Sequence, residues 1–159
     1  MSPKSILFVC LGNICRSPMA EGVFNKLIFE KGIYKSFIVD SAGLIAYHQG
    51  ELADSRMRGH AARRGYNLTH RSRPVTVADF DKFNLIIGMD DQNIRELQHL
   101  ARTPEHKAKI RRMTDFCVNL QATEVPDPYY GGDRGFEYVI DLLEDACGGL
   151  LKAISPQLP

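Results

Sequence analysis

The sequence has neither a long hydrophobic run nor an excess of charge of one sign. Its longest unbroken apolar run of note, residues 6–11, is far too short to cross a bilayer. Twenty Lys and Arg residues against 19 Asp and Glu residues leave a formal net charge of +1. We therefore expect no membrane insertion and no nucleic-acid-binding surface. The N-terminal apolar stretch lacks an A-x-A-like cleavage site, so no signal peptide is predicted.

Cysteine is scarce, and its spacing does not indicate a metal site. Cys10 and Cys15 lie close together, but Cys117 and Cys147 stand alone, with no second Cys/His pair beside them. The motifs G-x-x-x-x-G-K-[ST], G-x-G-x-x-G and H-E-x-x-H are also absent. We expect no metal and no cofactor. Four cysteines without a secretion signal favour a cytoplasmic protein.

Length and composition are those of one ordinary globular domain. The chain has 159 residues, of which 44% are apolar and 25% are charged. It shows no internal repeat, low-complexity tract or linker that would divide it. We expect a single domain over residues 1–159 that acts as a monomer.

Short buried strands alternate with amphipathic helical segments along the chain. Strands are predicted at residues 5–10, 37–41, 85–89 and 110–118. Helices are predicted from Pro18 to a C-cap at Gly32, over residues 57–64, after Thr76, after Asp90 and over residues 136–154. This order predicts a single three-layer α/β domain with a four-stranded parallel sheet and helices on both faces. Ligands bind beyond the carboxyl ends of such strands, which makes the loop after residue 10 the candidate site.

The loop after the first strand has the composition of an anion-binding site. Successive backbone N–H groups between a strand and a helix can converge on one anion. Gly12 permits unusual backbone dihedrals, and Asn13 tolerates a left-handed φ. Arg16 adds a planar fork that can hold two oxygens of one phosphate. The predicted phosphate-binding residues are Leu11, Gly12, Asn13, Ile14, Cys15 and Arg16.

Cys10 lies where a nucleophile beneath that anion would be. The helix N-terminus, Arg16 and the inward N–H groups all favour its thiolate, which is the nucleophilic form. Ser17 can donate a hydrogen bond to the thiolate. A strand-end cysteine by itself would more often be a small core residue. Here a nucleophile, a glycine turn, an arginine and a hydroxyl occur at the spacing that one site requires.

The sequence V-C-L-G-N-I-C-R-S-P resembles the low-molecular-weight protein tyrosine phosphatase family. Further landmarks occur in the same order: D-S-A-G at 40–43, G-M-D at 88–90 and D-P-Y-Y-G at 127–131. The spacing C-x5-R is shared by several phosphatase folds. Its position near the N-terminus, together with the late D-P-Y-Y, makes the resemblance specific, and it extends over nearly the whole chain.

The resemblance implies a metal-independent phosphatase acting on phosphotyrosine proteins or peptides and on small aryl phosphates, with inorganic phosphate also held at the loop. Cys10 would form a phosphocysteine, and Asp127 would act as general acid and then as base. The remaining implied roles are support of the loop by Ser17, Ser41 and His70, and a substrate pocket walled by Tyr47, Tyr129 and Tyr130.

Cys15 has a separate implied role. Two thiols on one loop can form a reversible disulfide after peroxide converts the more reactive one to a sulfenic acid. The resemblance implies that Cys15 protects Cys10 in this way. The alternative is that Cys15 is a buried packing residue.

Two other functions stay open. An arsenate reductase on the same fold would need further cysteines after the third strand, but none lies between Cys15 and Cys117. A non-catalytic phosphotyrosine-binding module would be expected to lack the nucleophile or the acid, yet Cys10 and Asp127 are both present. The loop from Leu44 to Glu51 differs from the vertebrate pattern, so the sequence leaves substrate preference undecided.

Overall fold

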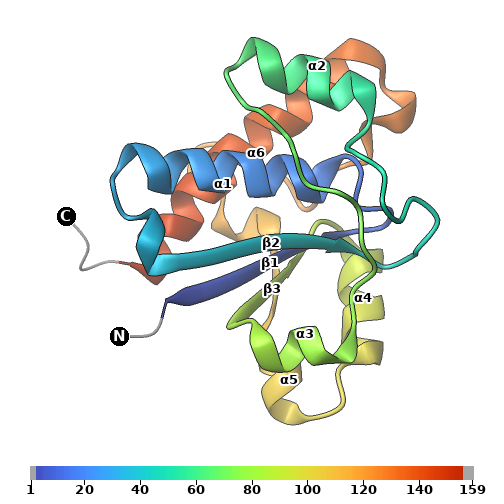
Figure 1. Ribbon diagram of the computed structural model, residues 1–159, viewed down its shortest axis with the longest axis vertical. Helices are drawn as coiled ribbons and strands as arrows, with labels where there is room; N and C mark the ends of the chain where they lie inside the picture. The colour runs from blue at the N-terminus through green and yellow to red at the C-terminus, as the bar shows by residue number, and fades with distance from the viewer. Residues whose placement is uncertain (1–2, 156–159) are drawn as a thin grey trace.

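Four parallel strands form the centre of the molecule. The structure is a computed structural model that describes residues 3–155, without the side chain of Tyr130. The strands are β1 (Lys4–Cys10), β2 (Phe37–Gly43), β3 (Leu85–Gly88) and β4 (Ile110–Arg112), in the sheet order β2-β1-β3-β4 (Figure 1). The strand β2 pairs with one edge of β1, and β3 pairs with the other edge, so the direction of strand addition reverses at β1. The carboxyl end of β1 therefore lies at the switch point where α/β sheets bind ligands.

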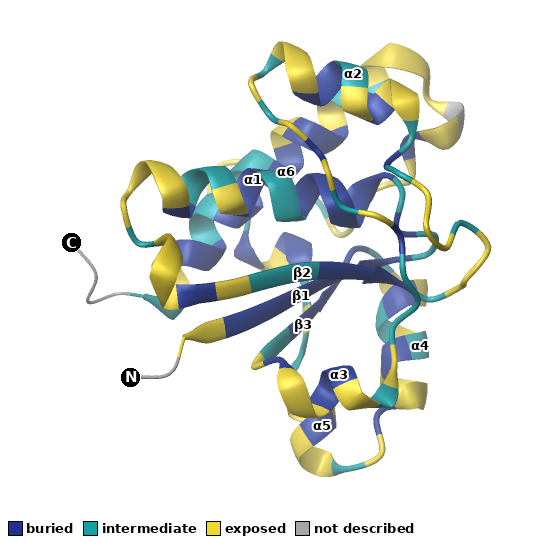
Figure 2. Cartoon of the chain, in the orientation of Figure 1, coloured by how far each residue is buried: buried dark blue, intermediate teal, exposed yellow. Residues whose placement is uncertain are grey.

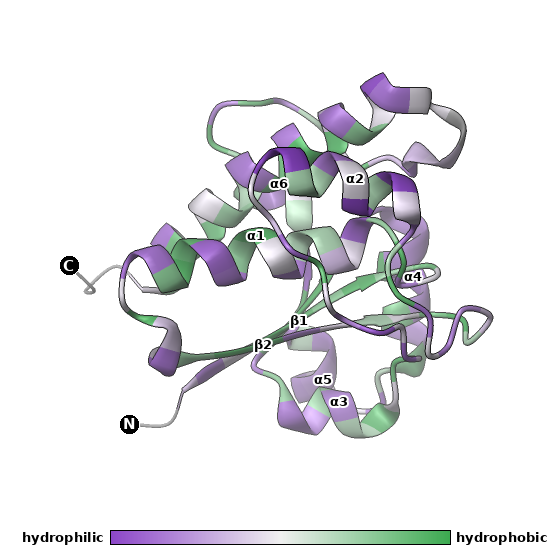
Figure 3. Ribbon diagram, turned by 45° about the horizontal axis from the view of Figure 1, so that its top comes forward, coloured by the Kyte–Doolittle hydropathy of each residue, from purple (hydrophilic) through white to green (hydrophobic). Residues whose placement is uncertain are grey.

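Helices lie on both sides of the sheet, as predicted. On one side are α1 (Arg16–Glu30), α2 (Ser55–Arg63) and α6 (Gly132–Ile154), and on the other are α3 (Val77–Lys82), α4 (Asp91–Leu100) and α5 (Pro104–Ala108). Hydrophobic and hydrophilic residues alternate along these helices, and the buried residues face inward (Figures 2 and 3). No helix within residues 3–155 is long and apolar enough to cross a membrane.

The central strand β1 contributes to both hydrophobic cores. Ile6, Phe8 and Cys10 belong to the core beneath α1 and α6, whereas Leu7 and Val9 belong to the core beneath α3 and α4. Side chains alternate between the two faces of a strand, so a strand covered on both faces reads as a continuous apolar run. Every residue of β1 after Lys4 is buried, and Cys10 is the last of them.

The predicted fourth strand is too long. The sequence predicted residues 110–118, but β4 ends at Arg112 and is followed by the 3₁₀ helix η2 (Met113–Phe116). Met113 and Phe116 join the core that α6 covers, and the Thr114 hydroxyl donates to the Thr123 carbonyl at 3.0 Å. Residues 110–118 (IRRMTDFCV) mix apolar residues with two arginines, a threonine and an aspartate, so their pattern does not define where the strand ends. The sequence pattern did not indicate α5, η1 (Tyr34–Ser36) or η3 (Pro128–Tyr130).

Two helix starts agree with the prediction, whereas α2 and α6 begin at Ser55 and Gly132, before the predicted residues 57 and 136. Thr76 and Asp79 form the predicted capping box at α3. Asp90 caps α4, accepting a hydrogen bond from the backbone N–H of Asn93 at 2.8 Å. These contacts are local in sequence, so the residue types alone indicate them.

Gly148 and Gly149 lie side by side in α6 but in different surroundings. A Cβ on Gly149 would lie 1.8 Å from the carbonyl oxygen of Phe116, whereas a Cβ on Gly148 would meet nothing within 4 Å. Gly149 therefore permits η2 to approach the helix, and Gly148 has no such role.

We predict opposite effects on stability for alanine at these two positions. Gly148→Ala raises the free energy of unfolding by about 1 kcal/mol, because alanine is the better helix former. Gly149→Ala lowers it by about 1–3 kcal/mol, because the backbone of η2 must move away. Urea unfolding followed by circular dichroism measures both. Equal shifts of the two midpoints would contradict the close packing of η2 on α6.

Candidate active site

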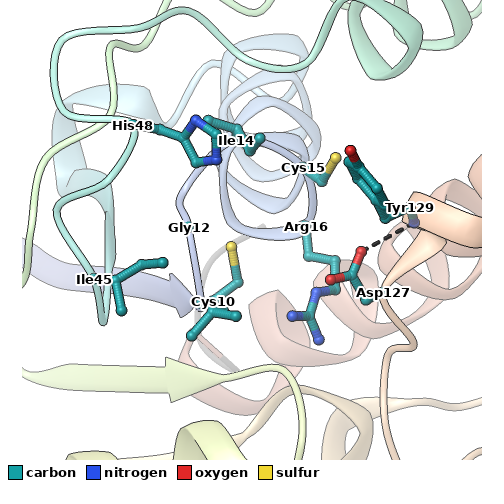
Figure 4. Close-up of a pocket in the computed structure, with 10 residues that line it drawn as sticks. Cys10, Gly12, Ile14, Cys15, Arg16, Ile45, His48, Asp127 and Tyr129 are labelled. Atoms are coloured by element: carbon teal, nitrogen blue, oxygen red, sulfur yellow. Dashed lines mark hydrogen bonds between the residues drawn. The ribbon is translucent and has the colours of Figure 1, made fainter.

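A small cavity opens at the carboxyl end of β1. Residues 11–15 curve around it before α1 begins at Arg16, and its volume is about 120 Å³ (Figure 4). The lining residues come from the loop, from the segment after β2 and from the segment before η3. They are Cys10, Leu11, Gly12, Ile14, Cys15, Arg16, Ile45, His48, Asp127 and Tyr129.

The loop backbone leaves its N–H groups available to an anion. The carbonyl of Leu11 accepts from the N–H of Ile45 at 3.0 Å, and that of Ile14 accepts from the N–H of Asp54 at 2.7 Å. The carbonyl of Gly12 accepts from the Ser72 hydroxyl at 3.1 Å. The N–H groups of residues 12–15, by contrast, donate to no group within the described chain. Such a set of unpaired donors around one cavity suits a bound oxyanion.

Asn13 holds the loop in shape. It is the only non-glycine residue with a positive φ among residues 3–155, at 58°, and it is 1% exposed. Its amide nitrogen donates to the hydroxyls of Ser17 at 2.7 Å and Ser41 at 3.0 Å. Its amide oxygen accepts from the N–H of Arg73 at 3.1 Å and lies 2.9 Å from Nε2 of His70. All hydrogen-bonding groups of the amide are thus paired, which fixes the left-handed turn.

Gly12 has a different role from the one predicted. The sequence assigned it an unusual backbone conformation, but its φ is not in the positive range. A Cβ at Gly12 would instead lie 3.2 Å from Cδ2 of His48. Glycine at this position therefore makes room for the imidazole at the cavity rim.

Cys10 lies at the base of the cavity. It is 2% exposed, and its Sγ lies 3.0 Å from the Ser17 hydroxyl oxygen. Because that oxygen already accepts a hydrogen bond from Asn13, the hydroxyl proton can be donated to the sulfur. In Figure 4 the sulfur is turned into the space that the loop encloses.

Arg16 is held by one end of its guanidinium group and open at the other. Nη1 donates to Oδ2 of Asp90 at 2.7 Å and to the carbonyl of Val125 at 3.0 Å. Nε and Nη2 have no partner within the described residues, although the side chain is buried and lines the cavity. Burial alone lowers the pKa of Arg16, but negative charge at Cys10 and Asp90 raises it above its ordinary value. The sequence indicated Asp90 as a helix start and as part of the G-M-D landmark, but it carried no signal for this contact with Arg16.

Asp127 and Tyr129 form one side of the cavity mouth, opposite Ile45 and His48 (Figure 4). The Asp127 carboxylate is exposed and accepts a hydrogen bond from the N–H of Tyr129 at 3.0 Å. The guanidinium of Arg56 lies 5.0 Å from the centre of the Tyr129 ring and donates to the Tyr129 carbonyl at 3.3 Å. These contacts fix the ring beside the carboxylate.

Tyr47 does not line the cavity, contrary to the prediction. It is 82% exposed, and its ring packs edge-on against His48. The backbone N–H of Ile45 binds the Leu11 carbonyl, which brings Ile45 rather than Tyr47 to the rim. The side chain of Tyr130, the third predicted wall residue, lies outside the described residues.

A partly buried polar cluster supports the loop from behind. The Ser41 hydroxyl donates to Glu21 at 2.6 Å, and Nδ1 of His70 lies 3.4 Å from both Glu21 and Asp40. Burial raises the pKa of Glu21 to about 7, and burial also lowers the pKa of His70. Both shifts favour the neutral form: the shift of Glu21 limits negative charge behind Cys10, and the shift of His70 limits positive charge there. The sequence indicated Ser41 and His70 but gave no signal for Glu21.

This cluster is also the one place among residues 3–155 compact enough to be considered for a metal. The ligand atoms of Glu21, Asp40 and His70 lie within 4.8 Å of one another. However, Glu21 is already bound by Ser41, and Asp40 forms an ion pair with Arg73 at 3.0 Å. We therefore assign no metal to it.

Known protein tyrosine phosphatases are similar to this chain over nearly its whole length. The family model described as low molecular weight phosphotyrosine protein phosphatase matches residues 5–158. A low molecular weight protein-tyrosine-phosphatase of Streptomyces coelicolor is 41% identical over 155 residues, covering 96% of this chain and 94% of that protein. The human low molecular weight phosphotyrosine protein phosphatase is 39% identical over 150 residues, covering 94% of each.

A solved structure is similar over the same extent. The crystal structure of protein tyrosine phosphatase from Entamoeba histolytica, with Hepes in the active site, is 49% identical with a TM-score of 0.92. The match covers 98% of this chain and 99% of that one. From the fold, the loop and these matches together, the chain belongs to the low molecular weight phosphotyrosine protein phosphatase family.

Proposed function

We propose that this protein hydrolyses phosphotyrosine in proteins and peptides, and small aryl phosphates, through a phosphocysteine on Cys10. The observation that carries the proposal is the position of the Cys10 sulfur beneath unpaired loop N–H groups and the open edge of Arg16. A tetrahedral oxyanion bound there would have its phosphorus above the sulfur.

In the first step the loop N–H groups and the Nε and Nη2 groups of Arg16 bind the three non-bridging oxygens. The Cys10 thiolate attacks phosphorus in line with the tyrosyl oxygen, forming the S–P bond as the P–O bond breaks. A phenolate leaves poorly, so Asp127 at the cavity mouth gives its proton to the departing oxygen.

In the second step Asp127, now a carboxylate, takes a proton from water as that water attacks phosphorus. The S–P bond breaks and inorganic phosphate is released. The hydroxyl of Ser17, 3.0 Å from the sulfur, stabilises the thiolate that leaves. Because fixed N–H dipoles and Arg16 stabilise the developing charge, the route requires no metal.

Cys15 is proposed to protect Cys10 from irreversible oxidation. Both thiols line the cavity, and burial, followed by the charge of Asp54, raises the pKa of Cys15. Peroxide would convert the Cys10 thiolate to a sulfenic acid. The Cys15 sulfur would then displace the hydroxyl as water, giving a disulfide that external thiols reduce.

Arsenate reduction is less well supported. All four cysteines lie within the described residues, and only Cys10 and Cys15 line the cavity. Cys147 is buried in the core, with its Sγ 3.7 Å from the Ala20 carbonyl. A relay of further thiols therefore has no route to Cys10 in this structure.

We predict that Cys10→Ser reduces phosphate release to background, because a neutral hydroxyl does not replace the thiolate. Release is measured from a phosphotyrosine peptide and an aryl phosphate at mildly acidic pH, with reductant and a metal chelator. Cys117→Ser, which alters a thiol outside the cavity, serves as the matched control and retains turnover. Absence of turnover by the folded, reduced wild type would overturn the proposed function and favour phosphopeptide binding without catalysis.

We predict that the effect of Asp127→Asn depends on the leaving group. For phenyl phosphate and phosphotyrosine, kcat falls by about 10²–10⁴-fold, the usual contribution of a general acid. For an aryl phosphate with strongly electron-withdrawing substituents the loss is much smaller, because that phenolate leaves without a proton. Equal losses across a leaving-group series would show that Asp127 is not the acid.

We predict that Cys15→Ser loses its recovery from oxidation. Each protein is treated with peroxide and then with a dithiol, and its activity is compared with its own untreated value. The wild type recovers because the disulfide is reducible, whereas Cys10 in the variant proceeds to irreversible acids. Full recovery by the variant would contradict the protective role.

A further inference from the structure

A groove continues from the catalytic cavity across the surface beside α2. It has a volume of about 540 Å³, and it shares Ile14, His48 and Tyr129 with the cavity. A peptide whose phosphotyrosine enters the cavity between those residues would therefore have its flanking residues at the groove.

Both acidic side chains of the groove have a partner within the protein. Glu51 lies 3.0 Å from Nδ1 of His48, an imidazole that carries a positive charge only when protonated. Asp54 is bound by Nε and Nη2 of Arg56 at 3.1 and 3.0 Å, and the pKa of Asp54 is lowered chiefly by that hydrogen bond. Arg56 is in turn occupied by Asp54 and Tyr129.

Two other arginines in the groove have no carboxylate partner. Nε of Arg58 donates to the Ala53 carbonyl at 2.9 Å, and Nη1 of Arg71 donates to the Gly50 carbonyl at 2.9 Å. Neither forms an ion pair with any residue in the described chain, and both are exposed. Each guanidinium is thus oriented by a backbone oxygen while its other N–H groups stay available.

The backbone holds Arg71 beside Leu52. Leu52 pairs with Arg71 in an isolated antiparallel bridge, and the N–H of Ser72 binds the Glu51 carbonyl at 2.8 Å. Arg58, Arg71 and Leu52 also line the adjoining hollow of about 510 Å³. Both arginines therefore line both hollows.

We propose that Arg58 and Arg71 form a subsite for a carboxylate of the substrate, an Asp or Glu side chain near the phosphotyrosine. The inference rests on the proposed function. A guanidinium matches a carboxylate in planar geometry, and two unpaired guanidinium groups attract it in a groove whose own acids are occupied. The subsite is solvent-exposed, so its contribution to kcat/KM is modest and decreases as the salt concentration rises.

The test compares kcat/KM for three phosphotyrosine peptides and one aryl phosphate. One peptide has alanines around the phosphotyrosine, one has Asp and Glu on its N-terminal side, and one has them on its C-terminal side. The variants are Arg58→Gln, Arg71→Gln and the double variant, because glutamine removes the charge and keeps a hydrogen-bonding side chain. Arg63→Gln removes the same charge from α2 at a position that lines neither hollow.

We predict that the wild type prefers one of the acidic peptides over the alanine peptide by about tenfold at low salt. Each single variant reduces that preference about threefold, and the double variant abolishes it. The aryl phosphate and the alanine peptide are hydrolysed at the same rate by all variants, and Arg63→Gln keeps the preference. Equal use of all peptides by the wild type, or a preference that persists in the double variant, would overturn the subsite.

Failure of the subsite and failure of the proposed function have different signatures. Turnover of the aryl phosphate without an acidic preference removes the subsite and leaves the phosphatase. If nothing is hydrolysed, binding of acidic and alanine peptides that carry a phosphonate in place of the phosphate is measured instead. Tighter binding of an acidic peptide that is lost in the double variant supports the subsite, and equal binding overturns it.

Discussion

The buried left-handed residue Asn13 is the constraint on which the site depends. A loop that presents its N–H groups to one cavity must pair its carbonyls on the outside, and it has little backbone bonding of its own to hold it. The Asn13 amide supplies that support through bonds to α1, β2 and the segment around Arg73. Four satisfied hydrogen bonds in a dry environment outweigh the roughly 1–3 kcal/mol that a strained conformation costs.

Arg16 depends on a second buried contact. Removing a guanidinium from water costs several kcal/mol, and Asp90 offsets that cost at one end of the group. The other end stays open toward the cavity without needing to reorganise when an anion arrives. Asp90 both caps α4 and holds Arg16, which couples the orientation of the arginine to the position of a whole helix. Preorganisation of this kind is the main source of electrostatic stabilisation in enzymes.

The sheet order brings these groups together. Because β1 lies between β2 and β3, the ends of both neighbours meet the loop: Ser41 arrives from β2, and Asp90 follows β3. Asp127 and Tyr129 come from the segment that leads to α6, and Arg56 of α2 holds that ring in place. The proposed carboxylate subsite lies on the same side, so substrate selection and chemistry share one edge of the molecule.

The α/β alternation, the buried first strand and the chemistry of the Cys10–Ser17 loop can all be read from the residue order. These features follow from local periodicity and from residue types at short spacing, and both are visible along the chain. Three features depend on packing between distant segments: the contact of Arg16 with Asp90, the position of Glu21 behind Ser41, and the presence of Ile45 and His48 at the rim in place of Tyr47. Tertiary structure also ended β4 early, where η2 packs against Gly149. Contacts between residues far apart in sequence depend on how the elements pack, and no local pattern records that packing.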